Sequence, residues 1–191
     1  MKIMTGPRNF EKSGDNNFDD LINRLLNKDK GKRINYEEYF NHSFFKFEEP
    51  ISIINFNKKY NYNISSYTRE FRTTNDNGNI LLKELSDVDF INLKELNMEF
   101  CKISDLTPLT NDIFKNLIFL NLQRNDISNL NPLINIKFLS IREIYFTLNQ
   151  ITDISPLEKI PFKCLKKLGL AYNPLIWDKD CERIYNSIIS T

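Results

Sequence analysis

Few side chains in this sequence have the types and spacing that catalysis or metal binding requires. His42 is the only histidine, and the three cysteines, Cys101, Cys164 and Cys181, are far apart with no paired spacing. A zinc site needs a close set of nitrogen and sulfur ligands, and a nucleophilic cysteine needs a base beside it. We therefore expect no metal, no cofactor and no catalytic residue. Each cysteine is interpreted as a small buried apolar side chain in a reducing compartment.

A second set of residues is suited to binding another protein. Side chains typical of interfaces recur every 24 residues, at Phe100, Arg124, Leu148 and Tyr172. Aromatic rings and arginine dominate the binding free energy at many protein interfaces. The simpler alternative is that these are single exposed apolar residues, which are normal on any protein surface.

The same 24-residue spacing defines the elements that must position this column. The pattern LxxLxLxxNxIxxLxxL begins at Leu93, Leu117 and Ile141, and a shortened copy begins at Leu165. Leu-x-Leu predicts a short strand with one buried face, and stacked copies supply one another with a core. The asparagine after each strand, replaced by Cys101 in the first copy, is expected to satisfy buried backbone groups.

Two further columns predict how each copy returns to the next strand. Prolines recur at Pro108, Pro132 and Pro156, and phenylalanines recur at Phe90, Phe114, Phe138 and Phe162. Proline removes a backbone donor and fixes φ, which favours a 3₁₀-like return over a long helix. The phenylalanine rings are expected to fill the wider convex side.

A fixed period of roughly 20 to 29 residues with this pattern resembles the leucine-rich repeat family. The resemblance implies an α/β solenoid: a horseshoe segment with parallel strands on its concave face and 3₁₀ or short-helix returns. In that family the variable strand positions of the concave face bind partner proteins. Carried onto this sequence, those positions are Glu95, Asn97, Glu99, Phe100, Phe119, Asn121, Gln123, Arg124, Glu143, Tyr145, Thr147, Leu148, Lys167 and Tyr172.

Residues 68–92 match only part of the repeat pattern. Asn77 falls in the asparagine position, but Arg69, Arg72 and Thr74 fall where buried strand residues should be. We interpret this segment as a degenerate capping repeat, because an end repeat with a full apolar face would expose its core.

The repeats at 93, 117, 141 and 165 are expected to end in a capping helix at residues 178–191. Asp178 is the expected N-cap of this helix. The apolar stripe of the helix consists of Cys181, Ile184, Tyr185 and Ile188. Before the repeats, residues 49–67 are expected to be a linker.

Residues 1–48 break the period and predict a small N-terminal helical segment. Its first helix has an apolar stripe of Leu21, Ile22, Leu25 and Leu26. Asn35 and Glu38 have capping-box spacing for a second helix that carries Tyr39, Phe40, Phe44 and Phe45. The basic residues between them are expected to be a solvated turn. Two such helices are too small to hold a core alone.

This segment resembles the last helices of a eukaryotic serine/threonine protein kinase domain, with the pattern DLIxxLLxxDPxxRIxxEEYFxHPFF. The matching residues are Leu21, Ile22, Leu25, Leu26, Asp29, Arg33, Ile34, Glu37, Glu38, His42, Phe44 and Phe45. Lys30 and Ser43 replace two prolines of the pattern. The resemblance implies that Arg33 would pair with the glutamate of an A-P-E segment, which this sequence lacks.

The motifs that transfer phosphate are also absent from the sequence. It has no Gly-rich loop, no V-A-I-K lysine, no H-R-D and no D-F-G, and only five glycines in all. We therefore expect no enzyme activity. The segment would be a truncated gene product, the end of a longer kinase, or a remnant reused as a cap. The alternative function is the C-terminal or regulatory part of a larger or degenerate kinase fused to the repeats.

Composition narrows the partners and the compartment. A formal net charge of +1 with no basic stripe argues against nucleic acid. No signal-like apolar region follows Met1, and no run of about 18 apolar residues could span a membrane. We expect a cytoplasmic, non-catalytic module that binds an unidentified protein on its concave face, with no nucleic-acid, membrane or small-molecule partner.

Overall fold

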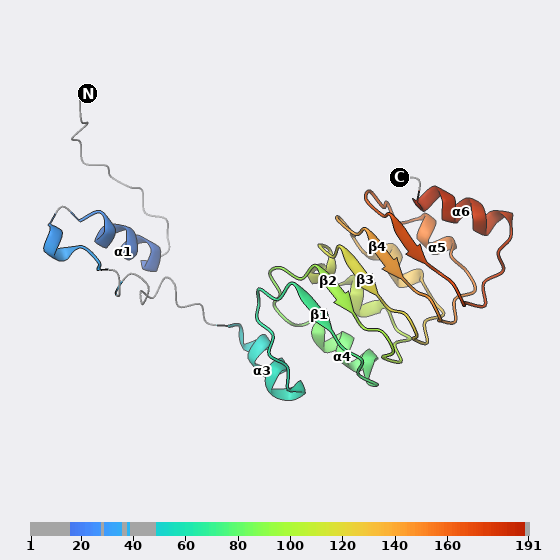
Figure 1. Ribbon diagram of the computed structural model, residues 1–191, viewed down its shortest axis with the longest axis horizontal. Helices are drawn as coiled ribbons and strands as arrows, with labels where there is room; N and C mark the ends of the chain where they lie inside the picture. Colours follow the sequence, from blue (N-terminus) through green and yellow to red (C-terminus); the bar gives the residue numbers. More distant parts are fainter. Residues whose placement is uncertain (1–15, 28, 36–37, 39–48, 190–191) are drawn as a thin grey trace, which may run out of the picture. The chain divides into compact units, whose positions relative to one another are not determined.

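The computed structural model describes residues 16–27, 29–35, 38 and 49–189. The chain divides into two compact units, Met1–Glu48 and Glu49–Thr191. In the first unit, helix α1 spans Asn16–Leu25 and the 3₁₀ helix η1 spans Lys30–Lys32 (Figure 1). Leu21 on α1 is buried, whereas Leu25 and Leu26, also expected on the apolar stripe, are exposed.

The capping box predicted in the first unit is confirmed. Asn35 Oδ1 accepts the N–H of Glu38 at 2.8 Å, and Glu38 Oε2 accepts the N–H of Asn35 at 3.3 Å. Arg33 Nε donates to the carbonyl of Asn27 at 2.7 Å. The apolar residues expected on the second helix, Tyr39, Phe40, Phe44 and Phe45, lie outside the described residues, and so do Glu37 and His42 of the kinase-like pattern.

The second unit is an open parallel sheet whose strands follow one another in sequence order (Figure 1). Its strands are β1 (Glu70–Arg72), β2 (Glu95–Asn97), β3 (Phe119–Asn121), β4 (Glu143–Tyr145) and β5 (Lys167–Gly169). From β2 onward the pairing keeps the 24-residue period, so that Leu96 pairs with Leu120 and Ile144 with Leu168. The structure therefore has the solenoid architecture that the repeat predicts.

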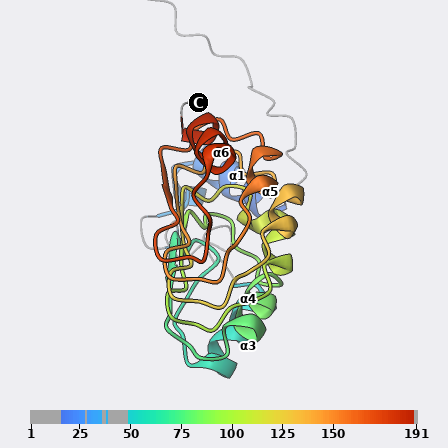
Figure 2. The same ribbon diagram turned by 90° about the vertical axis from the view of Figure 1, so that its right-hand side faces the viewer.

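Short helices connect the strands and lie together on one side of the sheet, as Figure 2 shows. They are α4 (Gly78–Leu85), η3 (Thr107–Thr110), η4 (Asp112–Phe114), η5 (Asn131–Asn135) and α5 (Ser155–Glu158). Each repeated proline falls in the first turn of η3, η5 or α5, as the proline column predicts. A short polar residue also recurs two places before each of these helices: Asp105, Asn129 and Asp153 each accept the N–H of the first helical residue.

The core lies between the strands and these returns. The strand leucines and isoleucines that define the period are buried, and so are Phe114, Phe138 and Phe162 of the phenylalanine column. The rings of Phe138 and Phe162 stack with centroids 6.5 Å apart. Phe90, the first of the column, is only partly buried against the same core.

The first repeat differs from the prediction by one residue. Phe71 pairs with Leu96, so β1 is 25 residues from β2, and Phe71 is the buried residue of the strand. Arg69 and Arg72, which a 24-residue offset placed in buried positions, are exposed. A shift of one residue turns every strand side chain to the other face, so the phase error moved both arginines into the predicted core.

Residues 49–67, expected to be a linker, contain helix α3 (Ile51–Tyr60). Its Ile53 and Phe56 are buried in the same core as the repeats. The ring of Phe56 meets that of Phe71 edge-on, with centroids 6.0 Å apart. This helix covers the first strand because an end strand would otherwise leave apolar surface in water.

The opposite end is covered by helix α6 (Lys179–Ile189). Asp178 Oδ1 accepts the N–H of Cys181 at 2.9 Å, which confirms the predicted N-cap. Cys181, Ile184 and Ile188 are buried, as their stripe predicts. In the described part of the chain, no helix has the length and apolar character needed to cross a membrane.

Candidate protein-binding face

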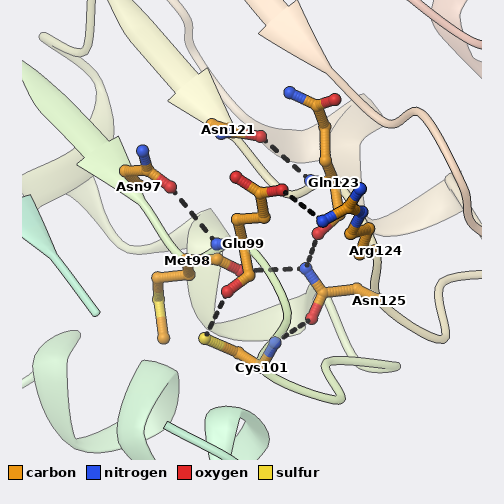
Figure 3. A network of polar contacts seen from close by, with 8 residues as sticks. All are labelled: Asn97, Met98, Glu99, Cys101, Asn121, Gln123, Arg124 and Asn125. Atoms are coloured by element: carbon orange, nitrogen blue, oxygen red, sulfur yellow. Dashed lines mark hydrogen bonds and ion pairs between the residues drawn. The ribbon is translucent and has the colours of Figure 1, made fainter. Parts of the chain in front are cut away.

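The asparagines after the strands hold adjacent repeats together. Asn125 Oδ1 accepts the N–H of Cys101 at 3.0 Å (Figure 3). The same oxygen accepts the N–H of Ile103 at 2.9 Å. Its Nδ2 donates to the carbonyls of Met98 at 2.9 Å and Gln123 at 3.1 Å. The groups of Cys101, Ile103 and Met98 are backbone groups of the preceding turn that would otherwise be buried without partners, whereas the Gln123 carbonyl also accepts the N–H of Phe100 at 3.0 Å.

Asn149 and Asn173 repeat this arrangement one and two repeats later. Asn149 accepts the N–H of Ile127 at 3.0 Å, and Asn173 accepts that of Ile151 at 3.0 Å. Both also donate to a carbonyl of the preceding repeat. The turns after β2, β3 and β4 are therefore each held by the asparagine of the next repeat.

Cys101 stands at the asparagine position of its repeat, and its thiol can only donate to carbonyl groups. Its Sγ lies 3.5 Å from the carbonyl of Thr73 and 3.4 Å from that of Glu99. Burial raises the pKa of this thiol from 9.0 to about 11, so it stays protonated and able to donate at neutral pH. Because a thiol offers no strong acceptor, the N–H of Gly78 bonds instead to the backbone carbonyl of Cys101, at 2.9 Å.

The turn places an exposed side chain at one equivalent position of each repeat in a left-handed backbone conformation, and the repeat of β2 adds Lys102, with φ 56°. At the equivalent position the φ angles are 59° at Phe100, 53° at Arg124, 58° at Leu148 and 58° at Tyr172. We call these four residues the left-handed column. Phe100 is 59% exposed, Leu148 41% and Tyr172 79%, so three large apolar side chains face solvent at equivalent positions. Non-glycine residues adopt this conformation only where the surroundings impose it, at a cost of order 1 kcal/mol or more.

Polar groups beside the column link neighbouring strands. Arg124 Nη1 lies 3.7 Å from Glu99 Oε1 on the adjacent repeat (Figure 3). The side-chain oxygen of Asn97 accepts the N–H of Glu99 at 3.3 Å. The side-chain oxygen of Asn121 accepts the N–H of Gln123 at 3.0 Å. These contacts hold the strand ends in fixed positions next to the left-handed column.

An aromatic and charged group lies on the outward side of β3, β4 and β5. The rings of Phe119 and Tyr145 have centroids 5.7 Å apart. The hydroxyl of Tyr145 donates to Glu143 at 2.8 Å, and Lys167 Nζ donates to the other oxygen of that carboxylate at 3.0 Å. A Cβ on Gly169 would lie 2.9 Å from the Tyr145 ring, so the absence of a side chain there makes room for the ring.

These hydrogen bonds shift the pKa values of Glu143, Tyr145 and Lys167. The hydrogen bond from Tyr145, together with that from Lys167, lowers the pKa of Glu143 below its ordinary value. The same bonds to Glu143 raise the pKa of Tyr145 and the pKa of Lys167. Each group is therefore held in its neutral-pH state: an ionised carboxylate, a protonated phenol and a protonated amine.

The structure brings most of the predicted partner-binding residues to one surface. The partly buried members are Glu95, Asn97, Glu99, Phe119, Gln123, Glu143, Tyr145 and Thr147. The exposed members are Phe100, Arg124, Leu148, Lys167 and Tyr172. Asn121 was expected there too, but it is 5% exposed and turns its side chain back onto the Gln123 N–H. The expectation that Asn121 is exposed is therefore wrong, and an amide in that position has little surface left for a partner.

Sequence reasoning missed a hollow at the C-terminal end of the sheet. It has a volume of about 540 Å³ and is lined by β5, the chain after it, and the rings of Tyr172, Trp177 and Tyr185. Trp177 is half exposed and meets Tyr185 edge-on, with centroids 5.3 Å apart. The lone tryptophan following the last repeat was the available signal for this site.

These observations define the class of the second unit: a parallel-stranded solenoid whose 24-residue units carry a leucine-rich pattern. No protein-family model matches the chain, and no curated protein does. Among solved structures it is similar to an internalin (inlF) from Listeria monocytogenes str. 4b F2365. That likeness has 30% identity over 48% of this chain and 24% of the internalin, with a TM-score of 0.38.

It is also similar to internalin C2 (inlC2) of the same strain. Here the identity is 25% over 53% of this chain and 42% of the other, with a TM-score of 0.44. The chain thus spans less than half the length of either solved structure. Both TM-scores are low, so the class of the fold rests on the geometry of the repeats. The kinase resemblance of the first unit finds no support in these comparisons and stays a prediction.

Proposed function

We propose that residues 49–191 form a non-catalytic protein–protein interaction module of the leucine-rich-repeat type, acting in the cytoplasm. Its partner protein docks on the strand face, which would be the concave face of a horseshoe. The observation that carries this proposal is the left-handed column. Four turns, the first three of them held by the asparagine of the next repeat, present Phe100, Arg124, Leu148 and Tyr172 at equivalent positions.

Rigidity makes this column suitable for binding. A turn whose backbone is already fixed loses little backbone conformational entropy when a partner packs against it. Aromatic residues and arginine in such positions are the usual centres of binding free energy. Phe119 and Tyr145 add further aromatic surface beside the column.

The charges of this face favour a protein over a nucleic acid. Arg69 lies 3.8 Å from Glu95, Arg124 lies 3.7 Å from Glu99, and Lys167 lies 3.0 Å from Glu143. Three basic groups are thereby paired with carboxylates, whereas binding to phosphates needs an unpaired basic surface. Among the described residues, no three potential ligands come together to hold a metal ion. We extend the proposal to the absence of catalysis and of a small-molecule or membrane partner.

The test is a triple substitution, Phe100→Ala, Arg124→Ala and Tyr172→Ala, in the full chain. Alanine removes the exposed side chains, and each residue keeps the backbone conformation that the ladder imposes. Proteins cross-linked to the unaltered chain in cell extract should be lost from the triple variant. A matched control replaces Ile80, Ile91 and Leu139, three exposed apolar residues outside the strands and the left-handed column.

Both triple variants should unfold at the temperature of the unaltered chain. Proteins that survive the first set but are lost with the control set would place the binding surface on the returns and contradict the proposal. If neither set changes the captured proteins, the strand face is not the docking surface.

A further inference from the structure

The ladder of parallel strands ends at β5 with two backbone donors unused. In the earlier repeats the equivalent N–H groups donate to the next repeat: Leu122 to Tyr145 at 2.9 Å, Arg124 to Thr147 at 3.0 Å, Phe146 to Gly169 at 2.8 Å and Leu148 to Ala171 at 2.9 Å. The corresponding groups one repeat later are the N–H groups of Leu170 and Tyr172. Within the part of the chain that the structure describes, neither has a hydrogen-bond acceptor.

The hollow of about 540 Å³ lies at this edge, with Leu170 and Tyr172 in its lining. Trp177 and Tyr185 give it aromatic surface. The hydroxyl of Tyr185 donates to the carbonyl of Leu168 at 3.2 Å, so one edge acceptor of β5 is already occupied. The site therefore offers directed backbone donors beside an aromatic surface, which is what an extended peptide recognises.

We propose that an extended peptide of a partner protein pairs with the outer edge of β5 as a sixth strand. The peptide runs parallel to β5, its carbonyls accept the N–H groups of Leu170 and Tyr172, and an apolar side chain packs on Trp177 and Tyr185. The chain already forms this backbone interface four times, always in parallel, and the fifth position continues it. The inference is independent of docking on the strand face, because it depends on the edge rather than on the exposed strand side chains.

A peptide of residues 117–126 is a suitable probe, because its strand β3 is paired on both sides in the native chain. The N–H of Phe119 points to the preceding strand, where it donates to the carbonyl of Lys94. The N–H of Asn121, two residues later, points to the same strand. The N–H groups of Leu122 and Arg124 point the other way. In a peptide bound as a sixth strand, only the N–H groups of Phe119 and Asn121 would therefore point toward β5.

N-methylation of the probe tests this geometry. Methyl groups on the N atoms of Phe119 and Asn121 should weaken binding to the unaltered chain about fivefold, because the Leu168 carbonyl is occupied by Tyr185 and one hydrogen bond is lost. With Tyr185→Phe, in which that carbonyl is free, the same peptide should lose about thirtyfold, since each lost hydrogen bond costs about fivefold. Methyl groups on the N atoms of Leu122 and Arg124 change the same number of atoms but should alter binding by no more than about twofold. Equal affinity of the two methylated peptides would overturn the proposal.

Hydrogen exchange in the full chain gives a direct reading of the edge. The Leu170 and Tyr172 amides should exchange fast in the free chain and at least about tenfold more slowly with saturating peptide. The Leu122 and Phe146 amides, bonded in the native ladder, should be slow in both states and serve as internal controls. Protection of Leu170 and Tyr172 that rises with the concentration of the chain alone would mean that a second copy occupies the edge, and would overturn the proposal.

Two substitutions separate edge pairing from simple adhesion. Trp177→Ala should weaken probe binding about tenfold, through lost aromatic contact. Tyr185→Phe should strengthen it about two- to fivefold, because the Leu168 carbonyl becomes free to accept an N–H of the peptide. Weaker binding of the probe to Tyr185→Phe would contradict backbone pairing of the peptide with β5. Phe100→Ala should leave probe binding unchanged, so a failure here is distinguishable from a failure of the strand-face proposal.

Discussion

The side-chain oxygen of Asn125 accepts the backbone N–H of Cys101 at 3.0 Å, so the asparagine of one repeat fixes the turn of the repeat before it. Asn125 makes four such backbone bonds. Cys101 occupies the equivalent position but offers only two long contacts from sulfur. The ladder is therefore strong in the middle of the solenoid and weak at its N-terminal end.

Removing the amide of Asn125 should cost much more stability than removing the thiol of Cys101. Asn125→Ala leaves three backbone groups without partners, the N–H groups of Cys101 and Ile103 and the carbonyl of Met98, and we expect a loss of about 3 to 5 kcal/mol. Cys101→Ala removes weak contacts and a small volume, and we expect about 1 to 2 kcal/mol. Urea unfolding followed by circular dichroism measures both. Equal losses would mean that the ladder does not contribute as the hydrogen bonds indicate.

Thiol chemistry should distinguish the three cysteines. Cys164 is exposed, whereas Cys101 and Cys181 are buried, and burial raises the pKa of both buried thiols. In the folded chain at pH 8, a thiol reagent should modify Cys164 alone, and all three should react after unfolding. The variant Cys164→Ser should therefore show almost no fast-reacting thiol. Fast reaction of that variant would show that a buried site opens readily.

The raised pKa of Cys101 also predicts a change in stability at high pH. A group whose folded pKa is raised favours the folded state at low pH and loses that effect as the pH rises toward the folded value. The free energy of unfolding should thus fall between pH 9 and about pH 11 because the unfolded thiol ionises first. Cys101→Ala should remove this part of the decrease. An unchanged pH profile in that variant would assign the decrease to other groups.

Gly78 should tolerate no side chain. A Cβ there would lie 2.3 Å from the backbone oxygen of Cys101 and 2.7 Å from its Cβ, and backbone cannot move aside easily. We expect Gly78→Ala to destabilise the chain by about 1 to 3 kcal/mol. Gly169→Ala is a useful comparison, because its nearest contact is the Tyr145 ring at 2.9 Å, which can shift. A smaller loss for Gly78→Ala than for Gly169→Ala would contradict this explanation.

The fold followed from the sequence wherever the 24-residue period held. From Leu93 onward the period alone distinguishes the buried leucines from the exposed strand positions, and the structure agrees. The period failed at Phe71, because one extra residue before β2 changes which face is buried. It also said nothing about α3, whose Ile53 and Phe56 lie outside the repeats and are buried by long-range contacts with the first strand.

The candidate site was predictable in part for similar reasons. Column positions identified Phe100 and Tyr172 as exposed, because exposure follows from the repeat. Asn121 was misplaced because its amide bonds to its own turn, and composition does not reveal such a local bond. The left-handed backbone was also invisible, since none of the four residues is a glycine.

This backbone conformation gives a prediction of its own at Leu148, where φ is 58°. Glycine adopts such angles without strain, and a β-branched residue resists them. We expect Leu148→Gly to be neutral or to stabilise the chain by up to about 1 kcal/mol, and Leu148→Val to destabilise it by about 1 kcal/mol or more. Leu139 is also exposed but lies outside the left-handed region, so Leu139→Gly should not stabilise. Thermal unfolding compares the three variants. Stabilisation by Leu148→Val would show that the backbone at residue 148 is not strained.

The titration of Glu143 reports whether the aromatic and charged group on the strand face forms in solution. Tyr145→Phe keeps the ring beside Phe119 but removes the hydroxyl that most strongly lowers the pKa of Glu143. We therefore expect the pKa of Glu143 to rise toward its ordinary value in this variant, measured by NMR of the side-chain carboxyl. Glu158, whose pKa is lowered by Arg183, should not change and serves as the control.

The sign of the accompanying stability effect follows from the direction of the shift. A carboxylate with a lowered pKa stabilises the folded chain above its ordinary pKa, and that contribution disappears as the pH falls through the lowered value. The difference in stability between the unaltered chain and Tyr145→Phe should therefore be present at neutral pH and vanish in acid. A difference that persists at acid pH would show that the hydroxyl acts through packing. An unchanged pKa of Glu143 would show that its bond to Tyr145 does not form in solution.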